Sequence, residues 1–492
     1  MTRFEPTLDS LRAHEVPAWF EDAKLGVMIQ WGPSSVPGWA PKEPFYNVLV
    51  GEITRFDPDD ELWKRVRALD QRPAPPEVIA DIASELGRDE YAWALRRCAE
   101  LGGWEAMDRY RAYAEWYQHT LAIADSPTAR WHAQTYGDRP YEAFGQDFAE
   151  ASADWDPAPW AELFAHACAR YVVPITKHHD GYTLWPSEVP NLNREGWSSP
   201  RDLMGDLAEA VRARDIRFAT YYSGGIDWTF DTSQGTPEGE TYARYADAHF
   251  RELIDRYAPD VLWNDIAWPA DADELKLFAD YYNANADGVV DDRFRPRRGR
   301  RYGDPTHWDF RTPEYATLAQ IPEHRWECVR ALGLSFGYNR LETDEDLVSV
   351  PDLVHMLCDV VSKNGNLLID VGPMADGTIP EIHAARLRGL GDWLRIYGDA
   401  IFGTRPWTRA EGETSDRTPV RFTRRDDDLF AIVLGEASGR VVIRDLQVEA
   451  SEVEVLGSGP VGARRTDDGL ALDVGSPSGS PAYAVRIGAG AR

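Results

Sequence analysis

The chain is organised around residues 259–269, which read Pro-Asp-Val-Leu-Trp-Asn-Asp-Ile-Ala-Trp-Pro. Val261 and Leu262 form an apolar run, and a proline stands at each end of the stretch. A short apolar run between such breakers is typical of a buried inner strand. We therefore predict a strand here, with Asp265 at the point where it stops.

Asp265 has a tryptophan on each side, Trp263 before it and Trp268 after it. Burying a carboxylate costs free energy, so one framed by indoles at a strand end indicates a chemical role. Indole faces stack on the C–H surfaces of sugars, and a carboxylate can attack or stabilise an anomeric carbon. The alternative is that Asp265 caps the segment that follows, as aspartate commonly does. The residues alone leave both interpretations open.

Strand-like and helix-like segments alternate along most of the chain, which predicts parallel βαβ units. With this many repeats we predict an α/β fold of the (β/α)8-like, TIM-type barrel class. An open doubly wound sheet is the alternative, but no GxGxxG follows the first strand. The predicted strands are 25–32, 171–180, 216–223, 261–265, 288–293 and 366–373, and the main predicted helices are 202–214, 240–257, 272–286, 351–363 and 380–397.

Three segments depart from this alternation. Residues 58–110 are charged, helix-forming and broken by prolines, so we predict a helical insertion of two or three helices. Short alternating runs within 417–488 predict an antiparallel β-sandwich. The expected organisation is a catalytic barrel over 1–404 and a sandwich over 405–492. Residues 295–301 form a basic run that we interpret as a solvated loop.

Composition narrows the classes of function. The formal net charge is −29, which disfavours nucleic acid and anionic membranes as partners because both repel an acidic protein. The first residues contain no signal-like apolar run, and no segment is long enough to span a bilayer. The four cysteines form no CxxC pair, so neither a thiolate metal site nor a disulfide framework is expected. Cytoplasmic localisation is the default expectation.

In a barrel, the residues at the carboxyl ends of the strands line the active site. Reading those ends yields one carboxylate, several ring donors, two indoles and a guanidinium, which is a set suited to binding a polyol. Glycoside hydrolysis needs a second carboxyl group, and Glu314, Glu115 and Glu327 are candidates that spacing does not separate. The strand-end residues are Gln30, Trp31, His178, His179, Tyr221, Trp263, Asp265 and Arg293.

The same set is poor for a metal. His178, His179 and Asp180 are consecutive, and on a strand the two histidines would face opposite sides. We therefore expect no metal site and no cofactor.

The chain resembles the α-L-fucosidases of glycoside hydrolase family 29 over residues 18–405. The resemblance extends weakly into the β-rich tail. It rests on ordered blocks at 20–27 (Phe-Glu-Asp-Ala-Lys-Leu-Gly-Val), 177–185 (Lys-His-His-Asp-Gly-Tyr-Thr-Leu-Trp), 222–228 (Tyr-Ser-Gly-Gly-Ile-Asp-Trp), 259–265, 335–339 (Ser-Phe-Gly-Tyr-Asn) and 364–373 (Asn-Gly-Asn-Leu-Leu-Ile-Asp-Val-Gly-Pro).

The resemblance implies a retaining exo-glycosidase acting on α-L-fucosides, with a β-sandwich tail. It implies Asp265 as the nucleophile and Glu314 as the acid/base. It also implies that Glu115, Trp116, His178, His179, Tyr221 and Arg293 bind the sugar. Gln30 and Trp263 join this set from their places at strand ends.

Two departures from the family pattern bear on specificity. The family's first strand usually ends in His-Trp-Gly, whereas this chain has Gln30 followed by Trp31 and Gly32. The insertion at 58–110 and the segment 294–306 are also longer than expected. The alternatives are therefore a relative specific for another 6-deoxy-L-sugar or for α-L-galactose, and a non-catalytic sugar-binding homologue. A metal-dependent barrel hydrolase is disfavoured by the ligand spacing. For the inserted helices, the alternative role is a contact in a homo-oligomer.

Overall fold

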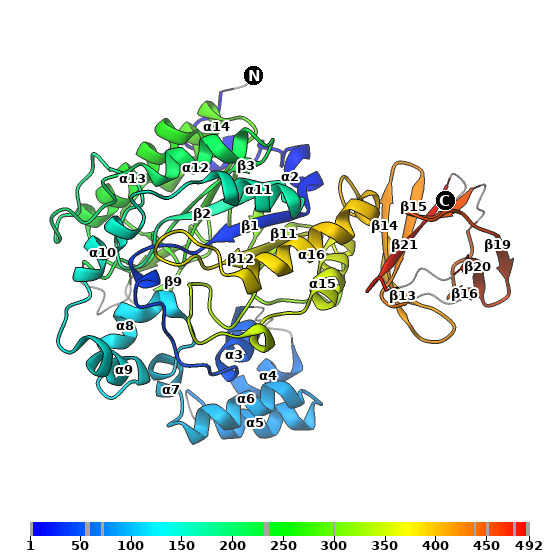
Figure 1. Ribbon diagram of the computed structural model, residues 1–492, viewed down its shortest axis with the longest axis horizontal. Helices are drawn as coiled ribbons and strands as arrows, with labels where there is room; N and C mark the ends of the chain where they lie inside the picture. Colours follow the sequence, from blue (N-terminus) through cyan, green and yellow to red (C-terminus); the bar gives the residue numbers. More distant parts are fainter. Residues whose placement is uncertain are drawn as a thin grey trace.

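A computed structural model describes residues 3–54, 60–69, 73–230, 236–298, 301–436, 439–448, 452–475 and 479–488. It places a large α/β part beside a smaller, antiparallel β part (Figure 1). The expectations for residues 58, 59 and 70–72, within the insertion, lie outside the described residues.

The large part is a barrel of parallel strands, as the alternation predicts. Its described strands run in the order β10-β11-β12-β1-β2-β4-β5-β7, with β3 pairing with β2 just before β4. A parallel bridge between Asp291, after β7, and Phe310, in β10, joins the two ends of this order. The strands are β1 (Leu25–Ile29), β2 (Tyr171–Lys177), β3 (Arg217–Phe218), β4 (Thr220–Tyr222), β5 (Val261–Asn264), β7 (Val289–Val290), β10 (Phe310–Arg311), β11 (Arg325–Ala331) and β12 (Gly365–Val371).

Helices follow the strands and cover the outside of the barrel (Figure 1). The long helix α13 (Glu240–Tyr257) has the predicted bounds, and four other helices begin and end within two residues of the predicted bounds. These four are α12 (Leu203–Arg212), α14 (Glu274–Ala284), α15 (Val350–Ser362) and α16 (Glu381–Tyr397). Helix α11 (Ala158–His166) precedes β2, and the short lead-in helices are α1 (Leu8–Leu11) and α2 (Ala18–Ala23).

Side chains alternate between the two sides of strand β5, and this alternation directs the Asp265 carboxylate into the barrel. Val261 and Trp263 are buried in the barrel interior, whereas Leu262 packs in the outer layer with the helices. Because side chains alternate along a strand, Asp265 continues the inward-facing series. The positive φ of Ile266, 67°, then turns the chain away.

The insertion contains more helices than the sequence predicts. Four lie within its described residues, rather than two or three, and they share a small core with α3 (Phe45–Thr54). The prolines at 73, 75 and 76 separate helices without ending the helical region, because Pro76 occupies a first-turn position that tolerates it. The four helices are α4 (Glu61–Arg67), α5 (Pro76–Glu85), α6 (Asp89–Glu100) and α7 (Glu105–Arg109).

Several elements have no counterpart in the sequence prediction. Strands β10 and β11 complete the barrel, and short helices link the insertion to the first regular repeat. These are η2 (Ala114–Trp116), α8 (Tyr117–Leu121), α9 (Pro127–Tyr136) and α10 (Ala143–Ala151), while η1 (Pro33–Ser35), η3 (Asp344–Asp346) and η4 (Gly398–Ala400) are single turns.

The basic run at 295–301 is not wholly a loop. Its described residues contribute to a small three-stranded sheet ordered β6-β8-β9, so that part of the interpretation is wrong. Trp268 pairs with Pro296, which ties the run to the segment that follows Asp265. The strands are β6 (Trp268–Pro269), β8 (Pro296–Arg298) and β9 (Arg301–Tyr302).

After η4 the chain forms two antiparallel sheets, as predicted for a β-sandwich. A bridge between Thr414 and Ile443 links the sheets, and residues of both, such as Phe422 and Leu472, are buried. Trp393 of α16 donates a 2.8 Å hydrogen bond to the carbonyl of Ala482, which fixes this part to the barrel. One sheet holds β13 (Arg405–Glu413), β14 (Pro419–Arg425), β15 (Asp428–Val433), β21 (Tyr483–Ile487), β17 (Val453–Val455) and β18 (Gly459–Pro460), and the other holds β16 (Gly439–Arg444), β20 (Gly469–Gly475) and β19 (Ala463–Thr466).

Candidate active site

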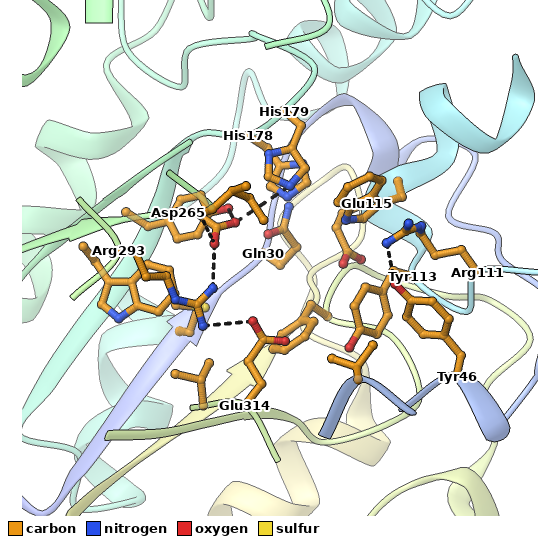
Figure 2. Close-up of a pocket in the computed structure, with 18 residues that line it drawn as sticks. Gln30, Tyr46, Arg111, Tyr113, Glu115, His178, His179, Asp265, Arg293 and Glu314 are labelled. Carbon is orange, nitrogen blue, oxygen red and sulfur yellow. Dashed lines mark hydrogen bonds and ion pairs between the residues drawn. The ribbon is translucent and has the colours of Figure 1, made fainter. Parts of the chain in front are cut away.

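A cavity of about 220 Å³ lies at the carboxyl ends of the barrel strands (Figure 2). Sites for drug-sized ligands begin near 300 Å³, so this volume suits one sugar ring. The cavity brings together the two residues assigned to catalysis and the eight assigned to substrate binding, but Trp31, the other indole expected at a strand end, packs against Trp160 outside it. The ten assigned residues that line the cavity are Gln30, Glu115, Trp116, His178, His179, Tyr221, Trp263, Asp265, Arg293 and Glu314.

The Asp265 carboxylate accepts three hydrogen bonds. Tyr221 donates to Oδ2 over 2.5 Å, Arg293 donates to Oδ1 over 2.7 Å, and the backbone N–H of Ile266 donates to Oδ1 over 2.8 Å. Three donors to its two oxygens hold the carboxyl group in one orientation. The structure does not support the cap interpretation, because the next helix, α14, is capped by Asp273 instead.

Arg293 joins the two candidate catalytic carboxyl groups. Its Nη1 donates to Asp265, and its Nη2 donates to Glu314 Oε1 over 2.9 Å. The guanidinium also donates to the side chain and the carbonyl of Thr312, each over 2.8 Å, and lies 4.5 Å from the Trp263 ring centre. Because all three of its nitrogens donate hydrogen bonds, this arginine fixes the separation of the two carboxyl groups.

Glu314 reaches the cavity because its segment runs beside a barrel strand. It forms a parallel bridge with Val329 of β11, and the neighbouring Tyr315 N–H donates to the Val329 carbonyl over 2.9 Å. Burial raises the pKa of the Glu314 carboxyl above its ordinary value, and the Asp265 charge acts in the same direction, while Arg293 opposes both. The group therefore holds a proton to higher pH than a free glutamate does.

The other two candidate glutamates differ in position. Glu327 does not line the cavity; it is buried below it, where it accepts hydrogen bonds from Tyr171 and, over 2.9 Å, from Trp263 Nε1. Glu115 does line the cavity and accepts from the Gly337 N–H over 2.8 Å. Burial raises the pKa of each of these glutamates to about 7.

The two histidines do not face opposite sides, so that expectation is wrong. Their ring centres lie 3.9 Å apart, and both rings line the cavity. Strand β2 ends at Lys177, and the turn that closes with the Gly181 N–H on the His178 carbonyl replaces the alternation. Burial lowers the pKa of both rings well below the ordinary value, so they are neutral donors and acceptors.

His179 is the better anchored of the two rings. Its Nδ1 is 2.6 Å from the Ser223 hydroxyl, and its Nε2 is 3.8 Å from Asp265 Oδ2. Trp116 packs edge-on against it, with ring centres 4.8 Å apart. Gln30 extends from the end of β1 into the cavity between the histidines and Glu115 (Figure 2).

Trp268 does not frame the carboxylate, contrary to the sequence interpretation. Its indole is fully buried in the outer layer, where it packs against Phe250 and Phe294 at ring-centre distances of 5.4 and 5.2 Å. The turn at Ile266 causes this, because it sends the following residues out of the barrel. Trp263 alone of the two contributes to the cavity.

Several lining residues carry no sequence signal of their own. Tyr113 and Arg111 immediately precede the Glu115-Trp116 pair, so proximity in sequence was a clue, but Tyr46 comes from a helix with no motif. The additional lining residues are Met28, Tyr46, Val50, Arg111, Tyr113, Ile266, Val329 and Phe336. Among the described residues, no group of three or more His, Cys, Asp or Glu side chains has the arrangement of a metal site.

A parallel barrel whose strand ends enclose a sugar-sized cavity with two bridged carboxyl groups has the architecture of a glycoside hydrolase. Comparison with known proteins agrees. A family model for alpha-L-fucosidase matches residues 1–61 and 99–399. The chain is 27% identical over 469 residues to the tissue alpha-L-fucosidase of Macaca fascicularis, covering 93% of this chain and 83% of that protein. It is 30% identical over 446 residues to the alpha-L-fucosidase of Branchiostoma floridae, covering 88% and 82%.

The fold also matches solved structures. A Thermotoga maritima alpha-fucosidase, crystallised with a mechanism-based inhibitor, is 39% identical with a TM-score of 0.79, over 99% of this chain and 100% of that chain. The chain therefore belongs to the alpha-L-fucosidase family and is a glycoside hydrolase, as the sequence motifs predict. Residues 62–98, which interrupt the match, fall within the helical insertion, and residues 400–492 lie beyond the match. None of the helices in the described part of the chain has the length and apolarity needed to cross a membrane.

Proposed function

We propose that the protein is a retaining exo-glycosidase that hydrolyses α-L-fucosides through a covalent glycosyl-enzyme. Asp265 attacks the anomeric carbon, and Glu314 protonates the leaving oxygen and then activates water. The observation that carries the proposal is the bridging of these two carboxyl groups by the single guanidinium of Arg293. Retaining enzymes need a close pair of carboxyl groups, about 5–5.5 Å apart, and one guanidinium spans only a short gap.

The environments of the two groups support different roles. Asp265 accepts hydrogen bonds from three donors, which suits a nucleophile held in a fixed orientation. Glu314 has a raised pKa because it is buried, which suits a group that must carry a proton to the leaving oxygen. Two Thermotoga maritima structures are 39% identical to this chain: an alpha-fucosidase in complex with a mechanism-based inhibitor, and an alpha-L-fucosynthase. Both agree with covalent chemistry on an α-L-fucoside.

The cavity volume of about 220 Å³ supports exo action, because it suits one sugar ring and not a longer chain. All of the lining residues lie between positions 28 and 336, which supports a catalytic part within 1–404 and a separate sandwich over 405–492.

Gln30 favours a second candidate, a preference for another 6-deoxy-L-sugar or for α-L-galactose. It lines the cavity in place of the histidine expected at the end of the first strand. Glutamine offers two donors and one acceptor on a flexible stem and cannot become cationic. It therefore forms a different hydrogen bond with a sugar hydroxyl than histidine does.

The test is hydrolysis of aryl α-L-glycosides that share one leaving group and differ only in the sugar. Proton NMR of the first product formed would report its anomeric configuration. We expect the α-L-fucoside to be cleaved with the α-anomer released first. First release of the β-anomer would rule out retention, and cleavage of none of the panel would contradict the proposed activity.

A further inference from the structure

Helix α3 presents two different faces, one to the inserted helices and one to the cavity. Phe45 and Leu49 are fully buried in the core that the inserted helices form. Tyr46 and Val50, one position further along, line the cavity. Residues four apart lie on the same side of a helix, so the packing of the insertion sets where this cavity wall stands.

Arg111 connects that wall to the sugar-facing tryptophan. It lines the cavity, and its guanidinium carbon lies 3.7 Å from the ring centre of Trp116 and 5.2 Å from that of Tyr46. Its Nη1 donates to the Tyr46 hydroxyl, and its Nη2 donates to Asp108 of α7 over 2.6 Å. The side chain is 13% exposed, and its buried Nε has no hydrogen-bond partner among the residues that the structure describes.

The ion pair with Asp108 is the solvated end of this arrangement. Asp108 is 59% exposed, so the pair adds little attraction of its own and acts mainly as a geometric tether. The stacking on Trp116 is more enclosed, and a planar guanidinium held on an indole face restricts both groups. Trp116 in turn packs edge-on against His179 and Trp228.

We propose that Arg111 is a positioning residue for the sugar-binding wall. It holds Trp116 and Tyr46 in one orientation and, through Asp108 and α3, makes the inserted helices a determinant of substrate affinity. This inference rests on the proposed function, because it takes Trp116 to be a sugar-binding side chain. Figure 2 places Arg111, Tyr46 and Tyr113 across the cavity from Asp265 and Arg293, so Arg111 acts on binding and not on the reacting atoms.

The experiment compares Arg111→Gln, Arg111→Lys and Asp108→Asn with wild type on one aryl α-L-fucoside, with L-fucose as a competitive inhibitor. In Arg111→Gln we expect KM and the L-fucose inhibition constant to rise together, by about twofold to thirtyfold, with kcat within about twofold. Arg111→Lys keeps the charge but lacks the planar guanidinium, so its KM and inhibition constant should lie between those of wild type and Arg111→Gln. Asp108→Asn should raise both constants slightly.

Arg109→Gln is the matched control, because Arg109 lies two residues away, pairs with the 85% exposed Glu105 and does not line the cavity. Its constants should equal those of wild type. If Arg111→Gln and Arg109→Gln have the same KM and inhibition constant and differ only in melting temperature, the positioning role is wrong. An inactive wild type that also fails to bind L-fucose would instead contradict the proposed function.

Discussion

Arg293 donates a 2.7 Å hydrogen bond from Nη1 to the Oδ1 atom of Asp265. The Arg293 side chain is 13% exposed. Desolvation lowers the pKa of its guanidinium, but four carboxyl neighbours outweigh that effect and hold the pKa above the ordinary value, so the group stays charged. A charged group at this position stabilises the carboxylate before attack and also binds Glu314. The roles proposed for Asp265 and Glu314 both depend on this contact with Arg293.

Asp265→Ala should lower kcat/KM by several orders of magnitude, because it removes the carboxylate proposed to form the glycosyl-enzyme. Added azide should restore turnover by occupying the space left by the carboxylate. The product should be a glycosyl azide with inverted anomeric configuration, which NMR identifies. Wild-type rates in Asp265→Ala, or no response to azide in a folded variant, would remove Asp265 from this role.

Glu314→Gln should slow substrates with poor leaving groups far more than activated aryl glycosides, since only the former need a proton from the enzyme. In wild type, kcat/KM should fall as pH rises through the raised pKa of Glu314, because its acid form is lost. Steady-state rates over a leaving-group series measure the first effect, and a pH profile measures the second.

Glu327→Gln is the control for that series, because Glu327 is a fully buried glutamate that lies outside the cavity. It should keep the wild-type dependence on leaving group. If Glu327→Gln or Glu115→Gln, and not Glu314→Gln, becomes selective for activated leaving groups, the acid/base role moves to that residue.

Glu115→Gln should stabilise the protein at alkaline pH while weakening substrate binding. Burial raises the pKa of Glu115 to about 7. A carboxyl group whose folded pKa exceeds its unfolded value lowers the free energy of unfolding as pH rises from about 4.5 to 7, by roughly 3 kcal/mol for this shift. The melting temperature of Glu115→Gln relative to wild type should therefore be higher at pH 8 than at pH 5. An equal difference at both pH values would show that this carboxyl group does not titrate in that range.

Gln30→His should change which sugar is preferred. A histidine offers a ring-defined donor that can carry charge, and the exchanged hydrogen bond is worth roughly 1–3 kcal/mol, or about one to two orders of magnitude in specificity constant. The measurement compares wild type and Gln30→His on α-L-fucoside, α-L-galactoside and other deoxy-L-sugar substrates with one leaving group. If wild type already prefers the α-L-fucoside strongly and the variant leaves ranking and rates unchanged, Gln30 does not determine specificity.

Much of the barrel and its site could be predicted, because the carboxyl ends of parallel strands must lie together at one edge of the sheet. Strands such as β5 and β12 are apolar runs bounded by breakers, and their carboxyl ends must meet at one edge. This is why Asp265, Tyr221 and Arg293, far apart in sequence, were expected in one site. Strands β10 and β11 were missed, because β10 has two residues and the sequence of β11, Arg-Trp-Glu-Cys-Val-Arg-Ala, mixes charged with apolar side chains.

The sequence by itself determined the fold class, the family and the set of polar residues at the strand ends, because local periodicity and ordered motifs carry that information. Only the tertiary structure decided that Glu314 and Glu115 line the cavity and Glu327 does not, and that His178 and His179 share a side. It also decided that Trp268 leaves the site and that Arg111 and Tyr46 join it. Those outcomes depend on turns such as that at Ile266 and on packing between distant helices. Sequence spacing does not encode them, because each results from contacts that form only when the barrel closes.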